Sequence, residues 1–486
     1  MNYSLTFKHF KSIVKIFFGN AFLISKLVGI LLFKYLDTLR QRKLIYFKNQ
    51  ILILIGIVEV LWASAPENFL PSKRLLLNHQ HTRDSLNFKA HEADLNSDNG
   101  RSQAIFAKAG EIGPRLLSSI GIENPHFSFI GSEITKSIGH VAQSLSLRQK
   151  IQNVHPEWHK GYIITSENSS NSNYLGYWYS YFPNLALNPK SESVIERELW
   201  PFFESVSSVL TPFGSMSYLQ AHDKYSREWE KLNRPALLKL TTEDKNGGYQ
   251  YLSEFGFPSS GGNGKFVTLH VRNSPEYHKG KYLDSSYGRN ANIQTYQKTV
   301  DFLIDLGYFV VRIGERGNHN LREQKNYLDF ASIGKHSEKL NTFLMAECDF
   351  FIGTDSGPIC VPPTFGKRVL MTNATNIGQT AYFSNSLMIP KLVENQVGVI
   401  QSLKEMFDCG AAWSNSLIRS KNSQSFNWKN NSEDEILMAV QELEGSSLVD
   451  SSIKREKFEE VIRGNGGIAT ANISLSFLDK WEDLLN

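Results

Sequence analysis

The stretch that decides the fold is residues 350–358, which read Phe350-Phe351-Ile352-Gly353-Thr354-Asp355-Ser356-Gly357-Pro358. An apolar run that passes straight into small and polar residues predicts a buried strand, a tight turn, and a short helix beginning after Asp355. The first backbone N–H groups of such a helix are suited to a phosphate. We therefore expect Thr354, Asp355, Ser356 and Gly357 to border a phosphate-bearing ligand. A capped glycine turn without a ligand is the alternative.

Strand and helix patterns alternate on both sides of this stretch. Strands are expected at 266–271, 308–313, 327–331 and 368–371, and helices at 293–306, 340–346 and 431–443. Strands that are apolar almost throughout, alternating with helices, predict a buried parallel sheet and hence an α/β fold class. In an open sheet of this kind, ligands bind beyond the carboxyl ends of the strands. The residues that follow each strand are therefore the candidate site.

Polar residues stand at the ends of two of these strands. His270 and Arg272 end the strand at 266–271, although a buried parallel strand is expected to be apolar on both faces. The planar guanidinium of an arginine suits phosphate oxygens. Arg312 and Gly314 end the next strand, where a glycine lets a ligand approach closely. Strand ends that merely reach solvent are the alternative.

The segment 273–291 is long and has no predicted structure. It interleaves basic and aromatic side chains with glycines and ends with Arg289 and Asn290. Connections of this length are usually functional or disordered. We interpret it as a lid over an anionic ligand, with a solvated loop as the alternative.

The N-terminal half contains a second strand–helix junction. A strand expected at 126–130 is followed by Glu133 and then by His140, both close to glycines, and another strand is expected at 161–165. A histidine at a junction of this kind is a candidate general base. We take His140 and Glu133 as the candidate catalytic residues, against the alternative of a structural histidine. A helix capped by Thr242, closed by Gly256 and followed by a flexible joint at 259–264, marks the boundary between the halves.

The charge is concentrated at one end of the chain. The first 50 residues hold nine Lys or Arg and one Asp, a net charge of +8, so the remaining 436 residues of this +4 chain sum to −4. Nucleic-acid enzymes usually spread basic residues over a binding face, so we expect no nucleic-acid partner. Phenylalanines and lysines on opposite faces of residues 7–17 predict a helix lying on an anionic membrane. Helices packed on the protein itself are the alternative.

Several motifs are missing from the sequence. The apolar runs 16–33 and 51–65 are interrupted or short of the ~20 residues that a membrane span needs. The chain has no Gly-x-x-x-x-Gly-Lys-Ser/Thr loop, no Gly-x-Gly-x-x-Gly after a strand, no Cys-x-x-Cys and no Asp-x-Asp pair. We therefore expect no metal and no cofactor, with arginines and backbone N–H groups neutralising any phosphate.

Taken in order along the chain, these motifs resemble a family of bacterial glycosyltransferases known largely from sequence. The His-x-Arg element is also similar to that of fucosyltransferases, the 354–358 turn to the donor turn of heptosyltransferases, and the 138–140 turn to an acceptor-side glycine–histidine turn. The resemblance covers roughly residues 126–445. The motifs that carry it are His270-Val271-Arg272, Arg289-Asn290-Ala291-Asn292-Ile293, Val311-Arg312-Ile313-Gly314 and Phe351–Gly357.

The resemblance implies a GT-B-like fold of two Rossmann-like doubly wound domains facing a cleft. It implies a metal-independent glycosyltransferase that moves a sugar from a nucleotide-diphosphate sugar to a surface-glycan or lipid-linked acceptor, in bacterial cell-surface polysaccharide biosynthesis. Arg272 would contact the donor diphosphate. A nucleotide-sugar 2-epimerase of the same fold and a non-catalytic nucleotide- or sugar-binding scaffold are the alternatives.

The expected organisation has five parts. Residues 1–65 form basic N-terminal helices that hold a cytoplasmic enzyme at the inner face of the cell membrane, and 66–120 form a polar, irregular tether. Residues 121–250 form the acceptor domain, 265–445 the donor domain and 446–486 a C-terminal tail.

Overall fold

The computed structural model describes residues 73–95, 98–119, 127–158, 160–166, 171–187, 192–193, 196, 200–233, 236–258, 264–272, 288–314, 320–333, 337–380, 386–412, 426–445, 452–469 and 471–486. The expected basic helices at 1–65 and most of the expected lid, residues 273–287, lie outside these ranges. Within them, no helix is both long enough and apolar enough to cross a membrane.

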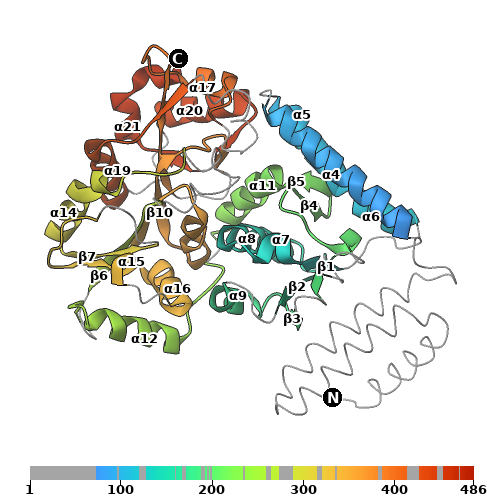
Figure 1. Ribbon diagram of the computed structural model, residues 1–486, viewed down its shortest axis with the longest axis horizontal. Helices are drawn as coiled ribbons and strands as arrows, with labels where there is room; N and C mark the ends of the chain where they lie inside the picture. The colour runs from blue at the N-terminus through green and yellow to red at the C-terminus, as the bar shows by residue number, and fades with distance from the viewer. Residues whose placement is uncertain are drawn as a thin grey trace.

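The C-terminal half is built on a parallel sheet of seven strands (Figure 1). The strand order reverses at β6: β7 and β8 lie on one side of it, and β9, β10, β12 and β16 lie on the other. This is the order of a doubly wound Rossmann sheet. The strands are β6 (Lys265–His270), β7 (Tyr308–Ile313), β8 (Tyr327–Asp329), β9 (Phe350–Thr354), β10 (Arg368–Ala374), β12 (Leu387–Pro390) and β16 (Asn472–Ile473).

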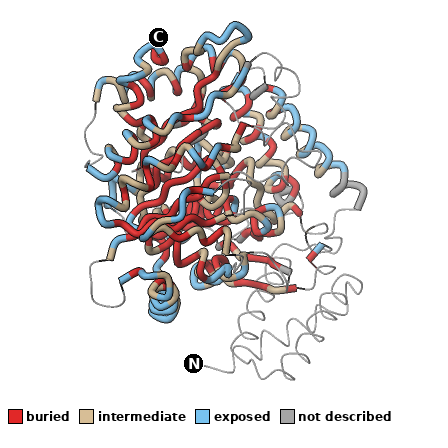
Figure 2. The backbone as a smooth tube through the Cα atoms, turned by 60° about the vertical axis from the view of Figure 1, so that its left-hand side comes forward, coloured by how far each residue is buried: buried red, intermediate tan, exposed pale blue. Residues whose placement is uncertain are grey.

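Helices cover both faces of this sheet. Because parallel crossovers are right-handed, a reversal of strand order places the connecting helices on opposite faces. α14 (Gln297–Asp305) packs beside α19 (Glu433–Gly445), and α16 (Glu338–Glu347) packs beside α12 (Thr242–Ser253). Every residue of β7 and β9 is buried as a result. Figure 2 shows the buried backbone concentrated in the interior, with exposed segments along the outer helices.

The N-terminal half holds a smaller parallel sheet of three strands, β1 (Phe127–Ile130), β2 (Lys160–Ser166) and β3 (Asn184–Leu187). Its helices are α7 (Ser132–Thr135), α8 (Ile138–Val154), α9 (Ser172–Trp178) and α11 (Tyr218–Lys231). A short antiparallel hairpin, β4 (Ser208–Thr211) and β5 (Gly214–Ser217), lies beside them. The predicted α/β class, with parallel sheets in both halves, is confirmed.

The segment predicted to be an irregular tether at 66–120 is helical in nearly all of its described residues. α4 (Lys73–Leu95) packs against α5 (Asn99–Gly110), and α6 (Ile112–Ser119) follows (Figure 1). The prediction of irregular structure was wrong because the residues that α4 and α5 bury are mostly small or polar and include one large apolar side chain, Phe106; the others are Ala90, Ala93, Ser102, Gln103 and Ala109. A stripe of this kind has little hydrophobic periodicity, so tertiary packing rather than the local pattern stabilises these helices.

The segment predicted to be a tail at 446–486 is folded in its described part. α20 (Ile453–Gly464) leads to β15 (Ile468–Ala469) and β16, and α21 (Leu475–Lys480) then packs on α19. β16 pairs with β12 as the seventh strand of the large sheet. A two-residue strand carries no sequence periodicity, so only its pairing reveals it.

The boundary between the halves differs from the prediction in two details. The cap of α12 is Thr241, whose side chain accepts a hydrogen bond from the Asp244 backbone, and not Thr242. α12 also packs on α16 of the C-terminal half, although it lies within the range expected for the acceptor domain. Gly256 does adopt the left-handed conformation expected after a helix, with φ +89°.

Candidate functional site

The strand order of the large sheet reverses beside β6, and the predicted residues gather at this switch point. The Ser356 hydroxyl, just after β9, lies 3.1 Å from Nδ1 of His270, which ends β6. The Arg272 backbone N–H donates to the Thr354 hydroxyl at 3.0 Å. Side chains from motifs more than 80 residues apart in sequence therefore meet at the edge where doubly wound sheets bind ligands.

His270 is buried and electrically neutral at physiological pH. Burial lowers its pKa to about 4, with further lowering from the positive charges of Arg272, Arg312 and Arg289. A neutral imidazole adds no positive charge for a phosphate. Its contact with Ser356 instead makes it a residue that holds the turn after β9 against the end of β6.

Gly314, at the end of β7, lies against the same histidine ring. Its φ is +113°, a backbone conformation that residues other than glycine rarely adopt. A β-carbon at this position would stand 3.0 Å from the His270 ring. The ends of β6, β7 and β9 therefore converge on one point, as the sequence predicted.

We expect Gly314→Ala to destabilise the protein by about 2–3 kcal/mol, because it adds both backbone strain and a clash with His270. Gly307→Ala is the matched control. Gly307 has a φ of +86° but no atom within 4 Å of its would-be β-carbon, so strain alone should cost about 1 kcal/mol. Urea denaturation measures both variants. Equal losses would contradict the contact with His270.

Two arginines stand partly exposed at this edge. Arg272 has the position predicted, directly after β6. Arg289 donates from Nε to the backbone oxygen of Asp355 at 2.8 Å, and its guanidinium lies 3.9 Å from the Asp355 carboxylate. Asp355 therefore holds the end of the 288–291 segment and partly neutralises Arg289.

The structure places Arg312 differently from the predicted donor site. Its side chain is 1% exposed and forms an ion pair of 2.8 Å with Asp329, its neighbour on β8. The arginine thus serves the packing of β7 on β8. Its charge still reaches His270, as the lowered pKa of that histidine indicates.

Lys391 and Thr375 are residues at this edge that sequence reasoning missed. Lys391 follows β12, is buried, and donates to the backbone oxygen of Asn290 at 2.7 Å. The Thr375 hydroxyl donates to the Asp355 carboxylate at 3.0 Å. His270 and Arg272 were identified because they are polar residues at the end of an apolar strand. The same criterion would also have identified Lys391.

The turn after β9 is not an α-helix. Gly357–Cys360 and Pro362–Phe365 form two 3₁₀ turns, η4 and η5, and Ser356 caps the first without a side-chain hydrogen bond. The prediction of a short helix after Asp355 holds only in this tighter form. Backbone N–H groups at Ser356 and Gly357 are the relevant donors here, since a four-residue turn has only a small dipole.

The N-terminal motif reaches this turn. A β-carbon on Gly139 would stand 2.9 Å from the Gly357 α-carbon, so the start of α8 and the start of η4 are in backbone contact. The Gln143 amide also donates to the Cys360 sulfur at 3.2 Å. The glycine of the predicted acceptor motif and the glycine of the predicted donor turn thus form one junction between the halves.

His140 is exposed beside this junction. Its Nδ1 lies 3.3 Å from the backbone oxygen of Glu133. A carbonyl can only accept, so Nδ1 is the donor in this contact, which leaves Nε2 as the ring nitrogen for proton transfer. The Glu133 carboxylate accepts from the Val206 backbone at 3.2 Å, which gives it an anchoring contact. His140 is therefore the better placed of the two predicted catalytic residues to take a proton.

Within the described ranges, no group of three or more His, Cys, Asp or Glu side chains is arranged to hold a metal ion. Among the described residues, Arg272, Arg289 and Lys391 stand at this edge against the carboxylate of Asp355, while Arg312 is paired with Asp329 between β7 and β8. The edge therefore has a positive excess that suits an anionic ligand.

We expect the free energy of unfolding to fall as the pH drops from 6.5 towards 4. The pKa of His270 is about 4 in the folded chain and about 6.5 when unfolded, so the unfolded chain binds the additional proton in this window. The stabilisation is complete above pH 6.5, and this residue alone accounts for about 3 kcal/mol of loss. In His270→Gln the slope of the unfolding free energy against pH should be smaller. An unchanged slope in denaturation measured across this range would contradict the neutral buried histidine.

No family model matches the chain, and no curated protein matches it. Its fold is similar to several solved glycosyltransferases. For a glycosyltransferase family 9 protein of Veillonella parvula, identity is 11%, coverage is 65% of this chain and 96% of that chain, and the TM-score is 0.41. For the E. coli ADP-heptose LPS heptosyltransferase II, identity is 12%, coverage is 55% of this chain and 90% of that chain, and the TM-score is 0.35. For a dodecameric iron-containing glycosyltransferase of enterotoxigenic E. coli, identity is 15%, coverage is 74% of this chain and 75% of that chain, and the TM-score is 0.34.

Proposed function

We propose that the protein is a glycosyltransferase that binds a nucleotide-diphosphate sugar at the switch point of its large sheet. The observation that carries this proposal is the convergence of β6, β7 and β9 on His270, with Arg272 partly exposed beside the Ser356–Gly357 turn. Two kinds of group that can donate hydrogen bonds to a phosphate, a guanidinium and backbone N–H groups, then stand at the edge where such sheets bind ligands.

The reaction would displace the nucleoside diphosphate from the anomeric carbon of the sugar. Arg272 and the N–H groups of the turn neutralise the charge that develops on the departing diphosphate. His140 stands beside the contact between Gly139 and Gly357 and takes the proton of the attacking acceptor hydroxyl through Nε2. A glycan or lipid-linked acceptor would then lie on the side of the N-terminal half, and the basic residues 1–50 would bring the enzyme to an anionic membrane.

Incubation with a set of radiolabelled nucleotide sugars tests the proposal. We expect label to pass from one of them to a glycan or lipid-linked acceptor. An epimerised nucleotide sugar without transfer would identify an epimerase, and binding without turnover would identify a scaffold. Either outcome would contradict the proposal while leaving the binding site in place.

We expect the activity to be independent of divalent metal. The positive excess of arginines and Lys391 at the edge supplies the charge that a metal would otherwise bring to the diphosphate. Initial rates measured in EDTA should equal those measured with magnesium. A large loss on chelation, restored by magnesium, would overturn the metal-independent mechanism.

A further inference from the structure

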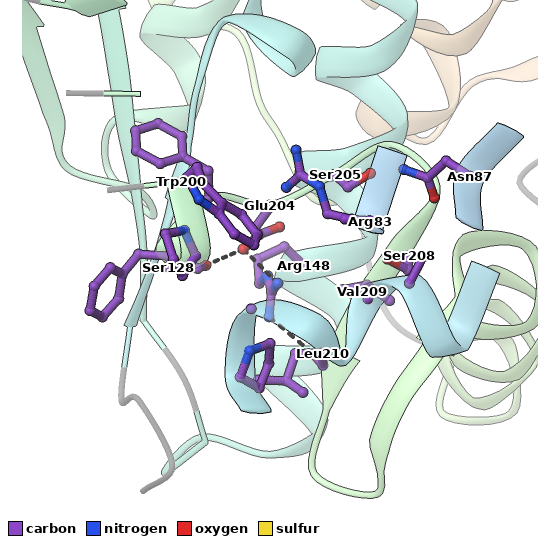
Figure 3. A pocket seen from close by; sticks show the side chains of 17 residues that line it. Arg83, Asn87, Ser128, Arg148, Trp200, Glu204, Ser205, Ser208, Val209 and Leu210 are labelled. Atoms are coloured by element: carbon purple, nitrogen blue, oxygen red, sulfur yellow. Dashed lines mark hydrogen bonds and ion pairs between the residues drawn. The ribbon is translucent and has the colours of Figure 1, made fainter. Parts of the chain in front are cut away.

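A second polar site lies in the N-terminal half, away from the switch point. A cavity of about 70 Å³ lies between the helices α4–α6 and the body of the small sheet (Figure 3). All of its lining residues fall between Arg83 and Leu210, so none belongs to the large sheet. This volume exceeds the minimum that one water molecule needs, and the lining is polar enough to hold an occupant.

A buried ion pair forms one wall of the cavity. Arg148 of α8 is 1% exposed, and its guanidinium lies 2.5 Å from the Glu204 carboxylate. The Ser128 hydroxyl of β1 also donates to Glu204, and Arg148 donates to the Leu210 backbone oxygen at 3.4 Å (Figure 3). The charge of Glu204 is thereby balanced within the wall.

Three N–H donors in the lining remain without a match. Nε of Arg148, Nε1 of Trp200 and Nε of Arg83 are buried and have no hydrogen-bond partner among the described residues. The Arg83 guanidinium lies 4.8 Å from the centre of the Trp200 ring, and its Nε is 3.6 Å from the carboxylate of exposed Asp84, which is beyond hydrogen-bond distance. Buried N–H groups in native proteins nearly always have a partner.

We propose that this cavity binds a small oxyanion of the phosphate or carboxylate class. The unmatched groups are three donors against one acceptor, Asn87 Oδ1. A water molecule donates as many hydrogen bonds as it accepts, so water satisfies this excess of donors poorly. An oxyanion has only acceptor atoms and accepts hydrogen bonds from all three.

The position of the donors gives the oxyanion a structural consequence. Arg83 and Asn87 belong to α4, whereas Arg148 and Trp200 belong to the body of the N-terminal half. A ligand shared between them links the helices to that body. Binding should therefore slow the opening of α4 more than that of any helix on the large sheet.

The experiment uses the full chain with inorganic phosphate or acetate as the probe and sodium chloride at matched ionic strength as the reference. Amide hydrogen exchange of Lys73–Leu95 is the local readout, with α19 as the internal reference. Thermal unfolding is the global readout. Arg83→Gln and Trp200→Phe each remove one unmatched donor, and Arg101→Gln is the control, because it makes the same charge change at an exposed site outside the cavity.

We expect phosphate or acetate to slow exchange in α4 and to raise the Tm by about 2 °C or more beyond the chloride reference, in the wild type and in Arg101→Gln. Affinity should fall at least ~10-fold in Arg83→Gln and Trp200→Phe. The slowing of exchange in α4 should persist in Arg272→Ala, which separates this cavity from the proposed donor site. Equal responses in chloride, equal responses of Arg83→Gln and Arg101→Gln, or loss of the α4 response in Arg272→Ala would overturn the proposal.

Discussion

Replacement of Arg272 by alanine should lower kcat/KM for the nucleotide sugar by about 10- to 150-fold, the equivalent of one charge-assisted hydrogen bond of about 1.5–3 kcal/mol. The fold should be unaffected, because the side chain is partly exposed and the contact that ties β6 to β9 is made by the backbone N–H of Arg272. Charge developing on the leaving group should place much of the loss in kcat.

Two further variants define what the guanidinium contributes. Arg272→Lys should recover only part of the activity, because it keeps the charge and loses the planar fork. Arg322→Ala is the control for a general loss of positive charge, since Arg322 is 65% exposed and pairs with Asp301 on the same half of the chain. If Arg272→Ala turned the donor over as the wild type does, the switch point would not be the donor site.

Replacement of Arg312 by alanine should lower the free energy of unfolding substantially and should have a smaller effect on catalysis. Removal of this side chain leaves the Asp329 carboxylate, 14% exposed, without its ion-pair partner at 2.8 Å. Loss of one member of a buried pair costs about 3–5 kcal/mol, because the remaining charge is desolvated and unmatched. Denaturant unfolding of the purified variant gives this free energy directly.

The matched control is again Arg322→Ala. It breaks an ion pair of 3.0 Å with Asp301, but both partners are exposed, so the loss should stay below about 1 kcal/mol. Arg312→Met tests the cause, because a buried apolar side chain replaces the volume but not the charge, and it too leaves Asp329 unpaired. Stability of Arg312→Ala close to that of Arg322→Ala would contradict the buried pair and return Arg312 to the candidate donor residues.

Much of the large sheet follows from local sequence. The expected strand at 308–313 is β7 in the structure, and the buried strand expected at the start of residues 350–358 is β9, Phe350–Thr354. These strands are predictable because burial on both faces requires continuous apolar runs. The convergence of His270, Gly314 and Ser356 was likewise predictable, since the carboxyl ends of parallel strands share one edge.

The parts that escaped prediction depend on pairing between distant residues. Arg312 is opposite Asp329 only because β7 pairs with β8 in this register, and no local pattern shows that pair. β16 is too short to be recognised without its neighbour β12. The helices of residues 73–119 bury few large apolar side chains among their described residues, and their polar composition therefore resembles that of a tether.

The neutrality of His270 also escaped the sequence argument. A histidine beside an arginine at a strand end suggested two groups for a phosphate, but burial and the surrounding arginines lower the pKa of the imidazole to about 4. The site then depends on Arg272 and on backbone N–H groups for its charge complementarity. His270 has a structural role, because its ring contacts both Gly314 and Ser356.

A nucleoside diphosphate should bind at the switch point beside Arg272, with or without its sugar. Calorimetric titration of nucleoside diphosphates into the wild type, Arg272→Ala and Arg322→Ala tests it most directly, since it requires neither the sugar nor the acceptor. We predict that one nucleoside diphosphate binds the wild type and Arg322→Ala with the same Kd and binds Arg272→Ala at least ~10-fold more weakly. Equal affinity for all three proteins, or no binding of any nucleoside diphosphate, would contradict the claim.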